Sequence, residues 1–99
     1  MPYGLEERHW QIVKKIAIDP LKTKNVSVWV FGSRARGDHK QYSDLDLLFE
    51  SKDELPAGFL ANIRLELEES SLPIKVELAD RRHLAESYKK QIELEKVQL

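Results

Sequence analysis

The segment from residue 26 to residue 50 constrains the fold more than any other part of the sequence. It contains two apolar stretches, residues 26–31 and 44–50, and each has the length and the apolar composition of a buried strand. The first stretch runs into Gly32, and the second carries Asp44 and Asp46 two positions apart. Side chains at i and i+2 of a strand point to the same face, about 6.6 Å apart. We therefore expect one strand to present both carboxylates on one face.

The remaining apolar pattern predicts helices that alternate with strands, as expected for a small α/β (α+β) domain with a three-stranded mixed sheet and packed helices. The predicted order is helix, strand, short helix, strand, helix, strand, helix. The first helix is expected to end before Pro20, and Pro56 to stand near the start of the third. The predicted helices cover residues 5–18, 33–36, 56–69 and from about 82 onward, and the predicted strands cover residues 26–31, 44–50 and 74–79.

The composition limits the classes of protein that this chain can belong to. Its 99 residues predict a single domain, residues 1–99. The absence of cysteine excludes disulfides and thiolate-bound zinc. The N-terminus lacks the apolar segment of a signal peptide, and no apolar run approaches the roughly 20 residues that span a bilayer. We therefore expect a cytoplasmic protein without a membrane partner.

The charge is distributed unevenly along the chain, although the net charge is only −1. Residues 32–43 carry three basic residues against one acid, a local charge of +2. Residues 44–80 carry ten acids against three bases, a local charge of −7. Binding to a long nucleic acid needs an extended basic surface, which this pattern does not provide. A compact basic segment beside an acidic one instead indicates a site for phosphate and metal.

The basic segment begins with a glycine turn that has the features of a phosphate-binding site. Gly32 has no Cβ, so a phosphate can approach the backbone closely. Ser33 adds a hydroxyl donor, and successive backbone N–H groups can form an anion-binding nest. Arg34 and Arg36 add positive charge in a geometry suited to phosphate. The alternative is a surface turn with solvated arginines.

The acidic residues predict a metal site next to that turn. Asp44 and Asp46 repel each other in a buried strand unless a cation neutralises them, and Mg²⁺ prefers carboxylates together with substrate phosphates. A two-metal site needs a further carboxylate, for which Glu77 and Asp80 are the candidates. We favour Glu77, because it alternates out of an apolar strand, whereas Asp80 stands where an N-cap is expected. The alternative for Asp44 and Asp46 is a solvated strand end.

Taken together, these residues resemble the minimal nucleotidyltransferases of the DNA polymerase beta superfamily. The resemblance covers residues 26–80 and is carried by Phe-Gly-Ser-Arg-Ala-Arg-Gly, residues 31–37, and by Ser-Asp-Leu-Asp-Leu, residues 43–47. It implies that Gly32 and Ser33 hold a nucleoside triphosphate and that Asp44 and Asp46 bind Mg²⁺. It also implies that Glu77 occupies the third acidic position, where many members have aspartate.

Small proteins of this type are similar to the antitoxin half of toxin–antitoxin pairs whose toxin is a HEPN-domain ribonuclease. In that family, some antitoxins transfer AMP from ATP to a tyrosine of the toxin. The resemblance thus implies a metal-dependent nucleotidyltransferase with ATP or another nucleoside triphosphate as substrate, a hydroxyl acceptor and a HEPN partner. Two alternatives remain open, namely a protein that neutralises its partner by occlusion and a nucleotide sensor.

The apolar residues near the C-terminus suggest where a partner could bind. The last predicted helix carries Ile92, Leu94, Val97 and Leu99, which a small core is not expected to cover fully. They form a candidate contact surface, and a frayed terminus is the alternative. The chain has no residues left for an acceptor domain, so a partner would have to present the acceptor.

Overall fold

The structure, a computed structural model that describes residues 1–99, is built around one four-stranded sheet with the order β3-β2-β1-β4. Strand β1 pairs antiparallel with β2 and with β4, and β2 pairs parallel with β3. The expected α+β fold with a mixed sheet is confirmed, but the expected number of three strands is wrong. The strands are β1 (Ser27–Phe31), β2 (Leu45–Glu50), β3 (Val76–Asp80) and β4 (Val97–Gln98).

The fourth strand replaces the end of the predicted last helix. Helix α5 (Glu86–Glu95) stops at Glu95, and the next residue, Lys96, has an extended backbone. Val97 then pairs with Val30, and the Leu99 N–H donates to the Val28 carbonyl at 2.9 Å. The sequence has no glycine or proline at this boundary, so the pattern did not indicate the helix end. The open edge of β1 offers the unpaired backbone groups that favour the extended conformation here.

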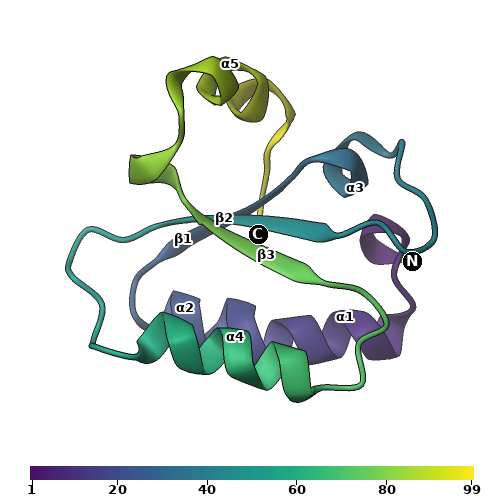
Figure 1. Ribbon diagram of the computed structural model, residues 1–99, viewed down its shortest axis with the longest axis horizontal. Helices are drawn as coiled ribbons and strands as arrows, with labels where there is room; N and C mark the ends of the chain where they lie inside the picture. The colour runs from purple at the N-terminus through teal and green to yellow at the C-terminus, as the bar shows by residue number, and fades with distance from the viewer.

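Helices cover one face of the sheet completely (Figure 1). A continuous helical segment consists of α1 (Glu7–Val13), the π-helical η2 (Lys14–Ile18) and α2 (Asp19–Thr23), and α4 (Phe59–Glu69) packs beside it. The fully buried residues of this layer come from both the helices and the strands. They include Val13, Ala17, Leu21, Val28, Val30, Leu45, Leu47 and Phe49. This layer is the main core, in which the helices pack against β1 and β2.

The first helical segment continues past Pro20, so the predicted end before this proline is wrong. Pro20 is the second residue of α2, the helix that follows directly on the π-helical turn. Proline lacks an N–H and its ring crowds the carbonyl of residue i−4. A π-helical turn, with its wider spacing between donor and acceptor, accommodates that missing bond without breaking the helix.

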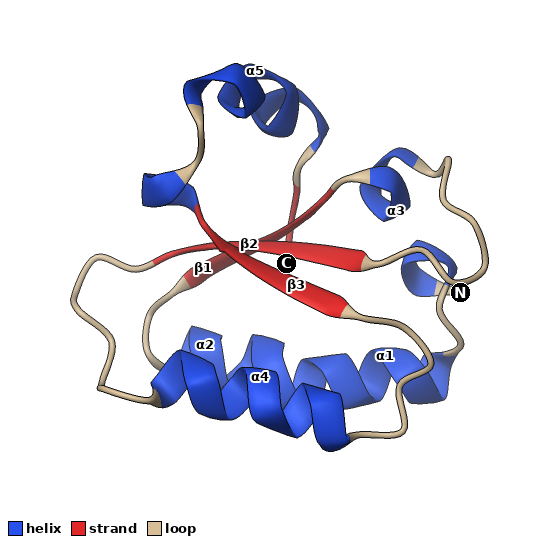
Figure 2. Ribbon diagram, viewed as in Figure 1, coloured by secondary structure: helices blue, strands red, loops and turns tan.

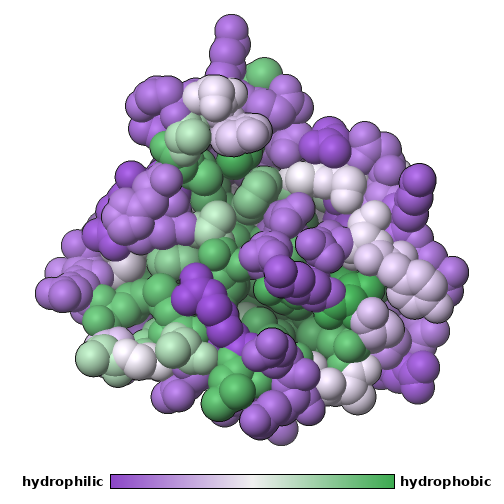
Figure 3. Space-filling model, viewed as in Figure 1, coloured by the Kyte–Doolittle hydropathy of each residue, from purple (hydrophilic) through white to green (hydrophobic).

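The opposite face of the sheet is covered only in part, by α5 (Figure 2). The buried contact is a small cluster of Trp29, Leu48 and Ile92. Side chains fill the space between α5 and α4 in this view, apolar in the middle and polar around the rim (Figure 3). Asp46 stands two residues before Leu48 on β2 and therefore shares this face, together with its register partner Glu77.

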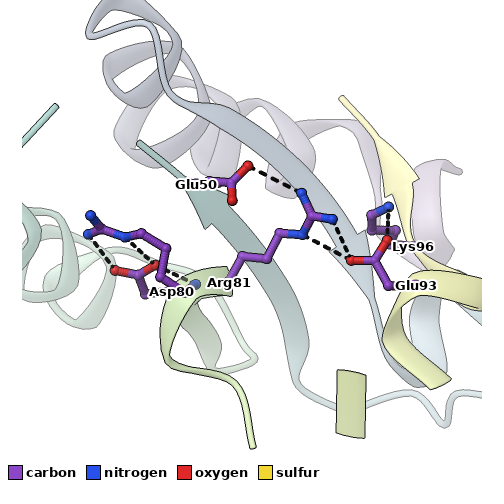
Figure 4. Close-up of polar contacts among 6 residues, drawn as sticks. Glu50, Asp80, Arg81, Glu93 and Lys96 are labelled. Carbon is purple, nitrogen blue, oxygen red and sulfur yellow. Dashed lines mark hydrogen bonds and ion pairs between the residues drawn. The ribbon is translucent and has the colours of Figure 1, made fainter. Parts of the chain in front are cut away.

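Polar contacts beside this cluster also attach α5 to the sheet (Figure 4). Arg81 pairs with Glu93 of α5 at 2.7 Å and with Glu50 of β2 at 3.2 Å. Lys96 Nζ pairs with a Glu93 carboxylate oxygen at 2.7 Å. Arg81 Cζ and Lys96 Nζ each lie 5.4 Å from the centre of the Trp29 ring. The helix is thus held by one aromatic anchor and a short ion-pair network.

Three short helical turns complete the fold: η1 (Pro2–Gly4), α3 (Ser33–Arg36) and η3 (Arg81–His83). Helix α3 has the predicted bounds, and Gly37 ends it with a positive φ of 88°. None of the helices combines the length and the apolar character that a bilayer span requires.

Candidate active site

The glycine turn lies directly beside Asp46. Phe31 at the end of β1 is paired with Asp46 of β2, and Gly32 follows with a φ of 79°. A Cβ built on Gly32 would overlap the Asp46 carboxylate and lie 3.2 Å from its Cγ. Both the backbone conformation and the space therefore require glycine here. The structure brings together the two halves of the motif that the sequence separates by ten residues.

The acidic residues line up across two neighbouring strands. Asp46 of β2 is paired in register with Glu77 of β3, so their side chains share one face of the sheet. Asp44 precedes β2 and is exposed. Asp80 lies elsewhere, because its carboxylate accepts from the Arg82 N–H at 2.9 Å at the start of η3. The geometry thus places Glu77, and not Asp80, beside Asp46.

Asp46 is the most perturbed carboxyl group of this site. Burial raises its pKa to about 6, and the negative charges of Asp44, Glu77 and Glu95 act in the same direction, against a smaller opposing effect of Arg36. Burial and the neighbouring carboxylates thus both disfavour an uncompensated negative charge on Asp46.

Replacing Asp46 with asparagine is expected to raise the free energy of unfolding in EDTA by about 1 kcal/mol near neutral pH. The folded pKa of about 6 lies above the ordinary value of 3.8. Wild-type stability therefore falls as the pH rises through this interval, and the loss is complete above it. Partial solvent exposure makes the effect smaller than the difference between the two pKa values implies. Thermal melts should differ most above about pH 7 and converge near about pH 4; an equal difference at both pH values would contradict this account.

The carboxylates suit a Mg²⁺–nucleotide complex better than a metal bound by protein alone. No three histidine, aspartate or glutamate side chains are grouped closely enough to hold a metal ion. Glu77 is half exposed and pairs with Lys75 at 2.7 Å. Mg²⁺ needs only one or two carboxylates when phosphate oxygens complete its coordination. The oxygen donors and the raised pKa of Asp46 fit such a partial site.

The two arginines of the turn have different environments. Arg36 is exposed, and its guanidinium lies between Asp38 at 3.1 Å and Glu95 at 2.9 Å. Arg34 is buried, only 2% exposed. Its guanidinium donates to the carbonyls of Tyr3, Ser43 and Gln41, at 2.8, 3.0 and 3.0 Å. Arg36 is thus exposed but held between two carboxylates, whereas the Arg34 guanidinium ties the N-terminal turn and the loop before β2 to α3.

Replacing Arg34 with alanine is expected to lower the free energy of unfolding by about 2–4 kcal/mol, because three carbonyls lose a charged donor inside the protein. The matched control is Arg36→Ala, which removes an exposed arginine two residues away and should cost less than about 1 kcal/mol. Chemical denaturation of both variants measures the difference. Equal stability of the two variants would show that the buried contacts of Arg34 do not hold the loop.

A further acidic residue at this site, Glu95, escaped the sequence analysis. Its carboxylate accepts from the Gly32 N–H at 2.9 Å and from the Arg36 guanidinium at 2.9 Å. It lies at the end of α5, 63 residues from Gly32. No motif connects the two, because tertiary contacts of α5 and β4 with the sheet bring them together. The sequence therefore carried no local signal for this contact.

Comparison with known proteins assigns the chain to a family. The family model described as a nucleotidyltransferase domain matches residues 7–99. The chain therefore belongs to the nucleotidyltransferase domain family, in agreement with the resemblance inferred from the turn and the paired aspartates.

Individual relatives point to a more particular group. The chain is 50% identical over 56 residues to the "Probable protein adenylyltransferase MntA" of Haemophilus influenzae. The match covers 54% of this chain and 47% of that protein, so the chain spans about half the length of this curated relative. A minimal nucleotidyltransferase of known structure superposes with a TM-score of 0.71 and 27% identity, over 96% of this chain and 97% of its own. A mutant of the toxin-antitoxin MntA-HpeT superposes with a TM-score of 0.63 and 25% identity, over 87% of this chain and 70% of its own.

Proposed function

We propose that this protein transfers a nucleoside monophosphate, AMP from ATP, to a hydroxyl group on a partner protein. The observation that carries the proposal is the contact between the Gly32 turn and Asp46. A glycine turn with a positive φ adjoins a carboxylate that faces other negative groups, and the chain belongs to the nucleotidyltransferase domain family.

The turn and the start of α3 would hold the triphosphate. The first N–H groups of a helix have no intrahelical acceptor, and no side chain caps α3. Ser33 and the exposed Arg36 lie at the same place and would add a hydroxyl and a positive charge. Arg34 would act differently, by tying the loop before β2 and the N-terminal turn to α3, the helix that carries Ser33 and Arg36.

Asp46, with Asp44 and Glu77 near it, would supply carboxylate oxygen for Mg²⁺, and oxygens of the triphosphate would complete the coordination. When bound, Mg²⁺ neutralises phosphate charge and polarises the phosphate under attack. The acceptor oxygen forms a bond to the α-phosphorus while the bond from that phosphorus to the bridging oxygen breaks. Pyrophosphate leaves with the electron pair, and the hydroxyl proton passes to solvent. The contribution of the protein is positioning and charge stabilisation.

The acceptor would belong to a toxin, with this protein as its antitoxin. Support comes from the name of the Haemophilus influenzae relative and from the toxin-antitoxin MntA-HpeT among the similar structures. Support also comes from the site itself, because Asp44 is exposed and Glu77 half exposed, which leaves room for a second protein. The resemblance of the motifs indicates a HEPN-domain toxin.

Titration of the chain with ATP, with and without Mg²⁺, and mass spectrometry of the co-expressed partner test this function. We expect ATP binding that depends on Mg²⁺ and a partner that gains the mass of one AMP group. A partner that is never modified, although ATP binds, would support a nucleotide sensor and contradict the proposed transfer.

A second candidate function is neutralisation of the partner by occlusion. It rests on Glu77, whose carboxylate pairs with Lys75 and does not belong to a group of three acidic or histidine side chains that could hold a metal ion. In that case, Asp44→Asn and Asp46→Asn variants would still neutralise the toxin, and neither ATP nor Mg²⁺ would be required.

A further inference from the structure

The carboxylate of Glu95 accepts three hydrogen bonds, and two of the donors belong to the segment from Gly32 to Arg36. Oε1 accepts from the Gly32 N–H at 2.9 Å. Oε2 accepts from Arg36 Nη1 at 2.9 Å and from Gln91 Nε2 at 3.0 Å. The side chain is only 7% exposed. A single buried carboxylate thus joins a backbone donor of the turn to the side chain of a candidate phosphate ligand.

The fold delivers Glu95 to this place by two attachments. On its C-terminal side, β4 pairs with β1, the strand that runs directly into Gly32. On its N-terminal side, Ile92 of α5 is buried against Trp29 and Leu48. Burial alone would raise the pKa of Glu95, but hydrogen bonds from Arg36, Gln91 and Gly32 hold it below its usual range. The group is therefore an anion fixed at the end of the sheet.

We propose that Glu95 is a positioning residue for nucleotide binding, which holds the Gly32 turn and the Arg36 guanidinium in the orientation that a triphosphate requires. The inference deepens the proposed function and rests on it. Glycine has the largest backbone freedom of any residue, and Arg36 is a long, exposed side chain. Fixing both before the ligand arrives removes part of the entropic cost of binding.

The donors that Glu95 uses leave others free for phosphate. It engages the Gly32 N–H, whereas the first N–H groups of α3 are not capped by any side chain. It also engages one terminal nitrogen of Arg36, while Nε pairs with Asp38 and the second terminal nitrogen has no hydrogen bond. Glu95 thus fixes the position of Gly32 and Arg36 and leaves the second terminal nitrogen of Arg36 and the first N–H groups of α3 unoccupied.

The test compares variants of two glutamates on α5. Glu95→Ala should raise the Kd for Mg-ATP about tenfold, with KM following Kd and kcat changing less. Glu95→Gln keeps an oxygen acceptor for the Gly32 N–H but loses the Arg36 ion pair, so an intermediate increase is expected. Glu93→Gln is the matched control, since Glu93 attaches α5 to Arg81 and Lys96 (Figure 4) and has no contact with the turn. Its Kd should stay within about twofold of wild type.

The outcomes distinguish positioning of the turn by Glu95 from a general effect of docking α5 on the sheet. Equal losses of affinity in Glu93→Gln and Glu95→Gln would overturn the inference, because docking of α5 alone would then explain them. Unchanged or tighter binding in Glu95→Ala would also overturn it, and tighter binding would mean that the carboxylate competes with phosphate. Should Glu95→Ala fail to fold, the Gln variant decides. Wild-type protein that does not bind Mg-ATP would instead overturn the proposed function itself.

Discussion

Replacing Asp46 with asparagine is expected to reduce nucleotidyl transfer by on the order of a thousandfold, the largest effect of any single conservative substitution in this protein. Asparagine keeps the shape of the side chain and removes its charge. Asp46 lies beside the Gly32 turn and in register with Glu77. We call the part of the sheet that carries Asp44, Asp46 and Glu77 the acidic face. The neutral side chain would bind a divalent cation only weakly, and the developing charge on the phosphate would lose its stabilisation.

The stability of the variant separates this loss from unfolding. Asp46→Asn should be at least as stable as the wild type in EDTA, because it relieves repulsion. Asp53→Asn, a change at an exposed acid in the loop after β2, serves as the matched control and should retain full activity. Initial rates of pyrophosphate release, measured with the partner protein present, give the comparison. Activity of Asp46→Asn within about tenfold of wild type would remove Asp46 from the mechanism.

Replacing Gly32 with alanine is expected to lower both stability and nucleotide binding, the latter by at least about a hundredfold. The added methyl group would overlap the Asp46 carboxylate, and the φ of 79° is strained for any residue with a Cβ. Either the turn or Asp46 must move, and both belong to the site. Isothermal titration with Mg-ATP and thermal melts measure the two effects.

The chain provides its own control for backbone strain. Gly58 also has a positive φ, 80°, but a Cβ placed there meets no atom within 4 Å. Gly58→Ala therefore adds the strain without the collision, far from the acidic face at the start of α4. It should cost about 1 kcal/mol of stability and leave ATP binding unchanged. Equal losses of binding in both variants would mean that the contact of Gly32 with Asp46 does not shape the site.

The first three strands and the shared face of Asp46 and Glu77 were predictable because they depend on local patterns. Alternation of side chains along a strand placed Asp44, Asp46 and Glu77 outside the main core, and β2 and β3 are paired so that Asp46 and Glu77 are neighbours. The short helical turn at residues 33–36, closed by Gly37, was also expected. Both inferences use only neighbouring residues.

The remaining features depend on contacts between distant segments. Arg34 and Arg36 look equivalent in the sequence, yet only the packing of the N-terminal turn against α3 buries Arg34. Glu95 reaches Gly32 because Ile92 packs on the sheet and two residues of β4 join β1, and a two-residue strand has too little pattern to be predicted. Pro20 was misjudged for a related reason, because the π-helical turn before it is not encoded by apolar spacing.

The central claim is that this acidic face transfers a nucleoside monophosphate, and the position of the radioactive label in ATP tests it most directly. The chain is incubated with its partner and Mg²⁺, in parallel with ATP labelled at the α-phosphate and ATP labelled at the γ-phosphate. The account predicts that the partner acquires the α-label and not the γ-label, and that Asp46→Asn abolishes the transfer. Transfer of the γ-label, or α-label transfer undiminished in Asp46→Asn, would contradict it.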